Sequence, residues 1–192
     1  MPSAGLHHVT AIAGNAARNR AFYEDVLGLR LVKSTVNFDD PGTRHLYFGD
    51  DAGRPGSILT FFPWGEGRKG RAGLGYATQT AFLAPQSSLG FWTHRLIEKA
   101  VPHGPVERRF GQSVLPFQDW DGTPLALVFD PTAEEIGAEA LGTVGADQAL
   151  RGFAQVTLLV ADAAPTASIL TDVFGWTEVG REGSRVRFSS GS

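Results

Sequence analysis

The sequence predicts an α+β fold of repeated β-α-β-β-β modules, in which the strands form curled mixed sheets and the helices lie outside them. Three observations support this prediction. Two sequence blocks recur at one ungapped spacing, another strand and helix lie between the copies, and turn residues divide the chain after each helix. Internal repeats decide the architecture because each copy is one structural unit.

The repeat consists of two pairs of segments that are both 147 residues apart. Each copy predicts a β-branched strand, a helix that begins at Asn15 or Asp162, and a glycine stop at Gly28 or Gly175. The aligned pairs are residues 5–12 (GLHHVTAI) with residues 152–159 (GFAQVTLL), and residues 25–28 (DVLG) with residues 172–175 (DVFG).

The repeat also predicts how the chain is divided. Residues 133–150 are small, acidic and rich in glycine, which is typical of a linker. The last module is one strand short, so we expect the protein to continue beyond Ser192. The predicted units are paired modules at 1–132 (module one at 1–65, module two at 72–132), a linker at 133–150 and an incomplete third module at 151–192.

Composition excludes several classes of partner. The net charge of -3, with both signs scattered, leaves no basic surface for nucleic acid or anionic lipid. The chain has no cysteine, so any metal must be held by nitrogen and oxygen donors. No stretch resembles a signal peptide or a membrane span. We therefore expect a cytoplasmic protein with a small-molecule partner, and the paired modules are compatible with a homodimer.

The candidate site is the histidine pair His7-His8 on the first predicted strand. Because side chains alternate along a strand, we expect the two to face opposite ways, so that one can bind a metal. An isolated strand histidine is usually a hydrogen-bonded core residue. The repeat makes that interpretation weaker here, because Ala154 and Gln155 occupy the equivalent positions and the fold needs no imidazole there.

The other expected metal donors are not obvious. A non-haem iron or manganese site typically uses two histidines and a carboxylate, yet the last strands of the first two modules, near residues 57–62 and 122–129, are apolar. His45 could line a pocket, or it could be an ordinary packed strand residue. His94 in a helix and His103 in a turn are expected at the surface.

The motifs resemble those of the vicinal oxygen chelate superfamily, which includes glyoxalases, bleomycin resistance proteins and extradiol dioxygenases. The similarity is greatest to ring-cleaving dioxygenases of the hydroquinone-cleaving type, and it spans essentially the whole chain. The motifs are LHHVT at 6–10, FYEDVLGL at 22–29, RHLYFGD at 44–50, GRPGSILTFFP at 53–63 and RFGQ at 109–112.

This resemblance implies a metal-dependent enzyme that cleaves hydroquinone- or catechol-like aromatics with dioxygen. It implies Fe(II), or in some members Mn(II), held by His8, with His7 and Thr10 beside the metal as catalytic groups. The other ligands have no matching positions here, so we expect them beyond Ser192 and expect this chain alone to be inactive. Two alternatives stay open: a glyoxalase-like isomerase or lyase, and a metal-free small-molecule-binding module.

Overall fold

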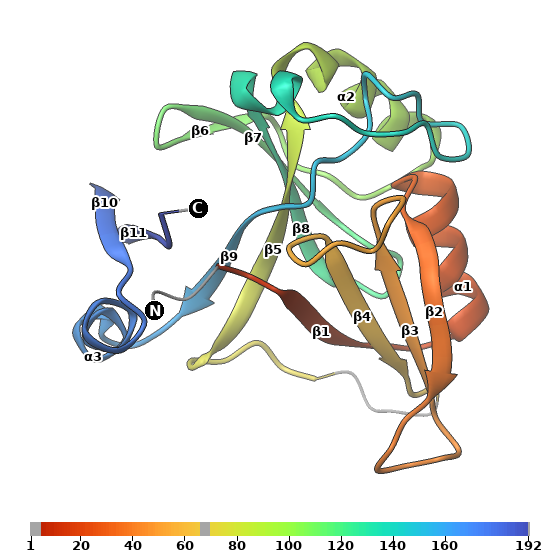
Figure 1. Ribbon diagram of the computed structural model, residues 1–192, viewed down its shortest axis with the longest axis horizontal. Helices are drawn as coiled ribbons and strands as arrows, with labels where there is room; N and C mark the ends of the chain where they lie inside the picture. The colour runs from red at the N-terminus through yellow and green to blue at the C-terminus, as the bar shows by residue number, and fades with distance from the viewer. Residues whose placement is uncertain (1–4, 66–69, 192) are drawn as a thin grey trace.

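The computed structural model describes residues 5–65 and 70–191, and it confirms the predicted architecture of repeated modules (Figure 1). The first module contains β1 (His8–Ala13), α1 (Ala16–Ala21), the π-helical turn η1 (Phe22–Val26), β2 (Arg30–Val36), β3 (Arg44–Gly49) and β4 (Ile58–Pro63). The second contains β5 (Tyr76–Pro85), η2 (Gln86–Ser88), α2 (Leu89–Glu98), β6 (Glu107–Arg109), β7 (Gln112–Gln118) and β8 (Pro124–Asp130). The third contains β9 (Phe153–Leu159), α3 (Ala163–Ser168), the π-helical turn η4 (Ile169–Val173), β10 (Thr177–Glu182) and β11 (Arg185–Ser189).

The first two modules have the same strand topology. In the first sheet, of order β1-β4-β3-β2, β1 and β4 are parallel and the other neighbours are antiparallel. The second sheet, of order β6-β7-β8-β5-β9, repeats this pattern, with β5 parallel to β8. The third module adds β9 antiparallel to β5, so β5 is an internal strand whereas β1 is an edge strand.

The helices repeat at the spacing that the sequence predicts. α1 with η1 and α3 with η4 both change from an α-helix to a π-helical turn at positions 147 residues apart. The predicted helix starts are confirmed, because the side chains of Asn15 and Asp162 accept hydrogen bonds from the backbone of Arg18 and Ala164. Within residues 5–65 and 70–191, no helix is long and apolar enough to cross a membrane.

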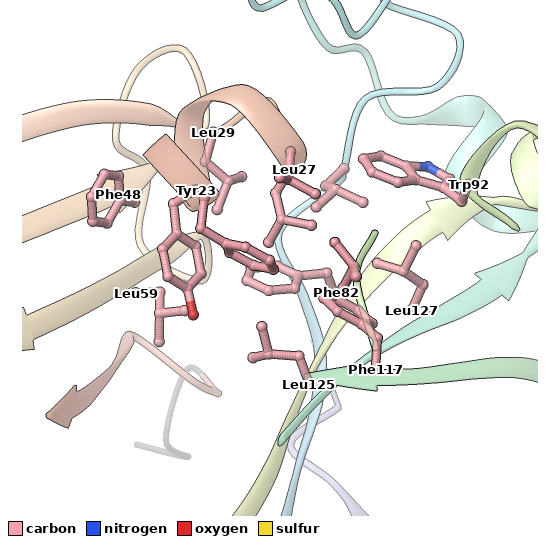
Figure 2. Close-up of a cluster of buried hydrophobic side chains, with 14 of the residues drawn as sticks. Tyr23, Leu27, Leu29, Phe48, Leu59, Phe82, Trp92, Phe117, Leu125 and Leu127 are labelled. Carbon is pink, nitrogen blue, oxygen red and sulfur yellow. The ribbon is translucent and has the colours of Figure 1, made fainter. Parts of the chain in front are cut away.

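Modules one and two share one hydrophobic core. Figure 2 shows Tyr23, Phe48 and Leu59 of the first module packed in the same cluster as Phe82 and Trp92 of the second, and all five are at most 1% exposed. Burial of this apolar surface is the main force that holds the two modules together.

A buried arginine and the segment after β8 reinforce this shared core. The guanidinium of Arg95, on α2, donates to the carbonyl oxygens of Val26 and Asp25 at the end of η1 (2.7 and 2.8 Å). The segment 133–150 begins within the 3-10 helix η3 (Pro131–Glu135), lies outside the sheets, and buries Val144 and Leu150 in the core. Together with the shared core, these contacts hold the second module against the helical side of the first, where η1 ends.

Candidate active site on the first sheet

The first strand places His8 on the side of the first sheet that faces away from the core. Val9 and Ala11 pack against the core, whereas His8 and Thr10 alternate with them and are exposed. The parallel register pairs Thr10 with Thr60 of β4, so their side chains lie on one face. We call this side, which carries His8, Thr10, His45, Tyr47 and Thr60, the open face.

The two histidines of the pair lie close together. Their Nδ1 atoms are 3.1 Å apart and their rings are nearly perpendicular, with 5.2 Å between centroids. The expectation that His7 and His8 face opposite ways is wrong, because β1 begins at His8 and strand alternation does not fix the direction of His7. Both side chains are exposed, so two imidazoles are accessible at one corner of the open face.

A chain of hydrogen bonds crosses the open face from β3 to β1. The Tyr47 hydroxyl contacts His45 Nδ1 at 2.9 Å, and His45 Nε2 contacts Thr60 Oγ1 at 3.0 Å. The Thr60 hydroxyl donates to Thr10 Oγ1 at 2.9 Å. Thr60 is fully buried by its neighbours, so its polar group depends on these contacts. The chain ends two residues from His8.

Aromatic rings line the same face beside this hydrogen-bond chain. The His45 ring lies 4.1 Å from the Tyr47 ring and 4.0 Å from the Phe62 ring between centroids. Phe62 in turn stacks with Trp64, whose indole nitrogen donates to Thr43 Oγ1 at 2.8 Å. We call His45, Tyr47, Phe62 and Trp64 the aromatic wall. Flat apolar surfaces of this kind suit an aromatic ligand.

The environment of His45 favours its neutral form. Partial burial lowers the pKa of His45 below the usual histidine value, and electrostatic repulsion from His8 and Lys33 lowers it further. A neutral imidazole has one donor nitrogen and one acceptor nitrogen, and each of the two nitrogens contacts a hydroxyl group, that of Thr60 or that of Tyr47.

The structure partly matches the site expected from the sequence. It brings His7, His8 and Thr10 together and places His45 beside them, while His94 and His103 are exposed elsewhere, as predicted. In the described part of the chain, no cluster of three or more histidine, aspartate or glutamate side chains could hold a metal ion. Within these residues the histidine pair offers two exposed imidazoles and no third side chain of these types in one cluster with them.

Tyr47, Thr60 and Phe62 were missed as site residues. The two-residue spacing of His45 and Tyr47 on one strand gives a weak signal, because such residues share a face. Thr60 and Phe62 could be found only from the pairing of β4 with β1 and β3, which brings Thr60 to Thr10, 50 residues earlier, and to His45, 15 residues earlier.

Comparison with known families agrees with this geometry. Residues 5–127 match the model of the Glyoxalase/Bleomycin resistance protein/Dioxygenase superfamily. The chain belongs to this superfamily. The superfamily name covers glyoxalases, bleomycin resistance proteins and dioxygenases, so membership establishes the fold and does not select one of these activities.

Curated relatives in the superfamily have names that specify ring cleavage. The chain is 45% identical to "Putative ring-cleaving dioxygenase MhqO" of Bacillus subtilis, covering 97% of this chain and 59% of the relative. It is 33% identical to the chlorohydroquinone/hydroquinone 1,2-dioxygenase of Sphingobium indicum, covering 98% and 60%. The chain thus spans about three fifths of the length of these relatives.

Solved structures support the superfamily fold. A crystal structure titled as a putative dioxygenase from Bacillus subtilis has a TM-score of 0.92 and 44% identity, covering 97% of this chain and 60% of that chain. A glyoxalase family protein from Enterococcus faecalis has a TM-score of 0.54 at 21% identity, covering 65% and 97%. The second match shows the shared fold alone.

The third module of the chain has different side chains at the positions equivalent to the histidine pair. Gln155 is the residue 147 positions after His8, and its side-chain oxygen accepts a hydrogen bond from Arg187 at 3.0 Å. Arg187 also donates to Gln112 of β7 at 2.8 Å, and its guanidinium lies 4.2 Å from the centroid of the Phe110 ring. An arginine thus fills this copy of the site.

Proposed function

We propose that this chain provides the first-module part of a ring-cleaving dioxygenase that acts on hydroquinone- or catechol-like aromatics with dioxygen. The observation that carries the proposal is that Thr10, which shares its strand face with His8, is linked through Thr60 to His45 of the aromatic wall. Membership of the superfamily and the names of the curated relatives support the same reaction class.

The proposal includes a divalent metal, Fe(II) or Mn(II), with His8 as a ligand. Imidazole nitrogen suits Fe(II), whereas Mn(II) prefers oxygen donors, so His8 with its neighbour His7 fits part of an iron site better than part of a manganese site. Among the described residues, no histidine, aspartate or glutamate joins the pair in a cluster of three that could hold a metal ion. We therefore propose that further donors come from protein outside residues 5–65 and 70–191. Bound metal would supply the redox chemistry with dioxygen that side chains cannot perform.

The residues of this chain would bind and orient the aromatic ring. The exposed parts of Phe62 and Trp64 offer a flat apolar surface, and the hydroxyl of Thr10 lies next to His8 on the same strand. Holding a ring between an apolar surface and one fixed polar group restricts its orientation, which lowers the entropic cost of reaction. His7 would be a catalytic group beside the metal, because its ring contacts the ring of the proposed ligand His8.

The proposal includes the module boundaries that the sequence predicts. Modules one and two occupy residues 1–65 and 72–132, residues 133–150 connect them to the next unit, and a third module begins at residue 151. The repeated strand topology and the spacing of the helices support these limits.

The test is oxygen uptake by the protein that contains this chain, after anaerobic loading with Fe(II) or Mn(II). We expect uptake with hydroquinone or catechol, together with formation of a ring-opened product. The His8→Ala variant should lose this activity, whereas His94→Ala, on the exposed side of α2, should retain it. No uptake with either aromatic, but turnover of the methylglyoxal–glutathione adduct, would show a glyoxalase-like enzyme instead.

A further inference from the structure

The hydrogen-bond chain on the open face can run in one of two directions. Each hydroxyl has a single hydrogen, and a neutral imidazole has a single N–H, so the first donor sets every later one. Either Tyr47 donates first and Thr10 ends as an acceptor, or Thr10 donates first and Tyr47 ends as an acceptor. In the first arrangement the hydroxyl hydrogen of Thr10 is left to donate to a ligand near His8. In the second it is already used in the hydrogen bond to Thr60.

Chemistry at the Tyr47 end favours the first direction. The phenol is the most acidic hydroxyl of the chain and a better donor than acceptor, and the unprotonated imidazole nitrogen is the most basic acceptor. Tyr47 therefore donates to His45 Nδ1, and His45 carries its hydrogen on Nε2, facing Thr60. Thr60 then donates to Thr10 across the 2.9 Å contact between their hydroxyl oxygens.

We infer that His45 is a positioning residue that makes Thr10 a hydrogen-bond donor toward the oxygen of the bound aromatic. Thr60 already donates to Thr10 Oγ1, and within the described part of the chain the Thr10 hydroxyl hydrogen has no protein acceptor. Thr10 is exposed and shares its face with His8. The ligand class is an aromatic with an acceptor oxygen, such as a phenolate, and this assignment rests on the proposed function.

The third module shows that the fold does not require the hydrogen-bond chain of Tyr47, His45, Thr60 and Thr10. Lys33 pairs with Tyr47 in the first module, and Gly180, which is 147 positions after Lys33, pairs with Arg187. Arg187 thus takes the place of Tyr47, and by the same register Arg185 takes the place of His45. Neither arginine can accept a hydrogen bond, so no such relay can form there.

The first test is the tautomer of His45, which needs neither metal nor activity. Nitrogen-15 NMR of the labelled protein at neutral pH distinguishes a protonated Nε2 from a protonated Nδ1. We expect His45 to be protonated on Nε2, and Tyr47→Phe to weaken that preference. A ring protonated mainly on Nδ1 would overturn the inference, because Thr10 would then be oriented the other way.

The second test separates positioning from a structural role. His45→Gln keeps one donor and one acceptor on a side chain of similar reach, whereas His45→Phe keeps a ring and removes both. We expect His45→Phe to raise KM for hydroquinone roughly tenfold, the effect of one lost hydrogen bond, with kcat much less changed. His45→Gln should restore KM to within about threefold of the wild type.

The matched control replaces His94, an exposed histidine of α2, by phenylalanine and by glutamine. Both control variants should keep the wild-type KM. Equal KM values for His45→Phe and the wild type would overturn the role of His45. If the wild type cleaves no aromatic ring, the proposed function fails, and the NMR spectrum alone decides the direction of the hydrogen-bond chain.

Discussion

The open face of the first module and the arginine-filled site of the third are two copies of one structural unit with opposite chemistry. In the first, His8 is exposed beside the hydroxyls of Thr10 and Thr60, and the ammonium of Lys33 lies 5.5 Å from the centroid of the Tyr47 ring. In the third, the guanidinium of Arg187 is held by Gln155 and Gln112 and stacks on Phe110. The third module therefore already has a cation, the guanidinium of Arg187, at this position. The difference shows that side chains alternating along a few strands give two copies of one sequence repeat different surfaces.

Exchanging the two strand residues should produce the largest effect. His8→Gln gives the first module the residue of the third, and ring cleavage should fall at least about 100-fold, since even the groups that support metal ligands contribute 10- to 100-fold. The reciprocal change Gln155→His should leave kcat/KM nearly unchanged. Steady-state oxygen uptake of both variants provides the measurement. Similar losses in the two variants would mean that the copies are not functionally different.

Removing the arginine should produce an intermediate effect, on stability. Arg187→Met loses two hydrogen bonds and the contact with Phe110 and leaves the oxygens of Gln155 and Gln112 without this donor. We expect the free energy of unfolding to fall by about 1–3 kcal/mol, measured by urea denaturation.

The control for this prediction is Arg185→Met, because Arg185 is exposed on the same strand. Its free energy of unfolding should stay within about 0.5 kcal/mol of the wild type. An Arg187→Met variant as stable as this control would show that the guanidinium does not hold the third module in place.

The smallest effect concerns the pH dependence of stability. Burial lowers the pKa of His45 in the folded protein, so the unfolded chain binds a proton more readily than the folded one. Neutral His45 therefore contributes stability at pH values above the unfolded pKa, near 6.5, and this contribution is lost as the pH falls through the folded pKa.

Urea denaturation at pH 7 and pH 5 tests the sign. The loss of stability between the two should be smaller in His45→Gln than in the wild type, because glutamine does not titrate. An equal or larger loss in the variant would show that His45 is not the group responsible.

The sequence predicted the repeated architecture because that information is local and occurs more than once. The strand and helix of residues 5–28 recur at 152–175, and the structure repeats even the change from α1 to η1 in α3 and η4. The π-helical turns themselves were not predicted, because η1 and η4 have ordinary apolar helical patterns. A π-helical turn is a local backbone conformation that the spacing of apolar residues does not predict.

The site was less predictable because it depends on contacts between distant strands. His8 could be found from comparison of the copies, but the contact of His45 with Thr60 needs the register of β3 on β4, and that of Thr60 with Thr10 needs the register of β4 on β1. The direction of His7 was mispredicted because it lies just before the strand, where alternation no longer applies.

The shared core limits how this protein can be recombined. Because Tyr23 and Phe48 pack in one cluster with Phe82 and Trp92, residues 5–65 contribute only part of the apolar interior that supports the open face. A chimaera that exchanges the first module alone would join two halves of different interiors, and overpacking or voids would follow. The unit that can be transplanted between homologues, to graft one substrate preference onto another, is therefore the pair of modules together with the segment that closes over them.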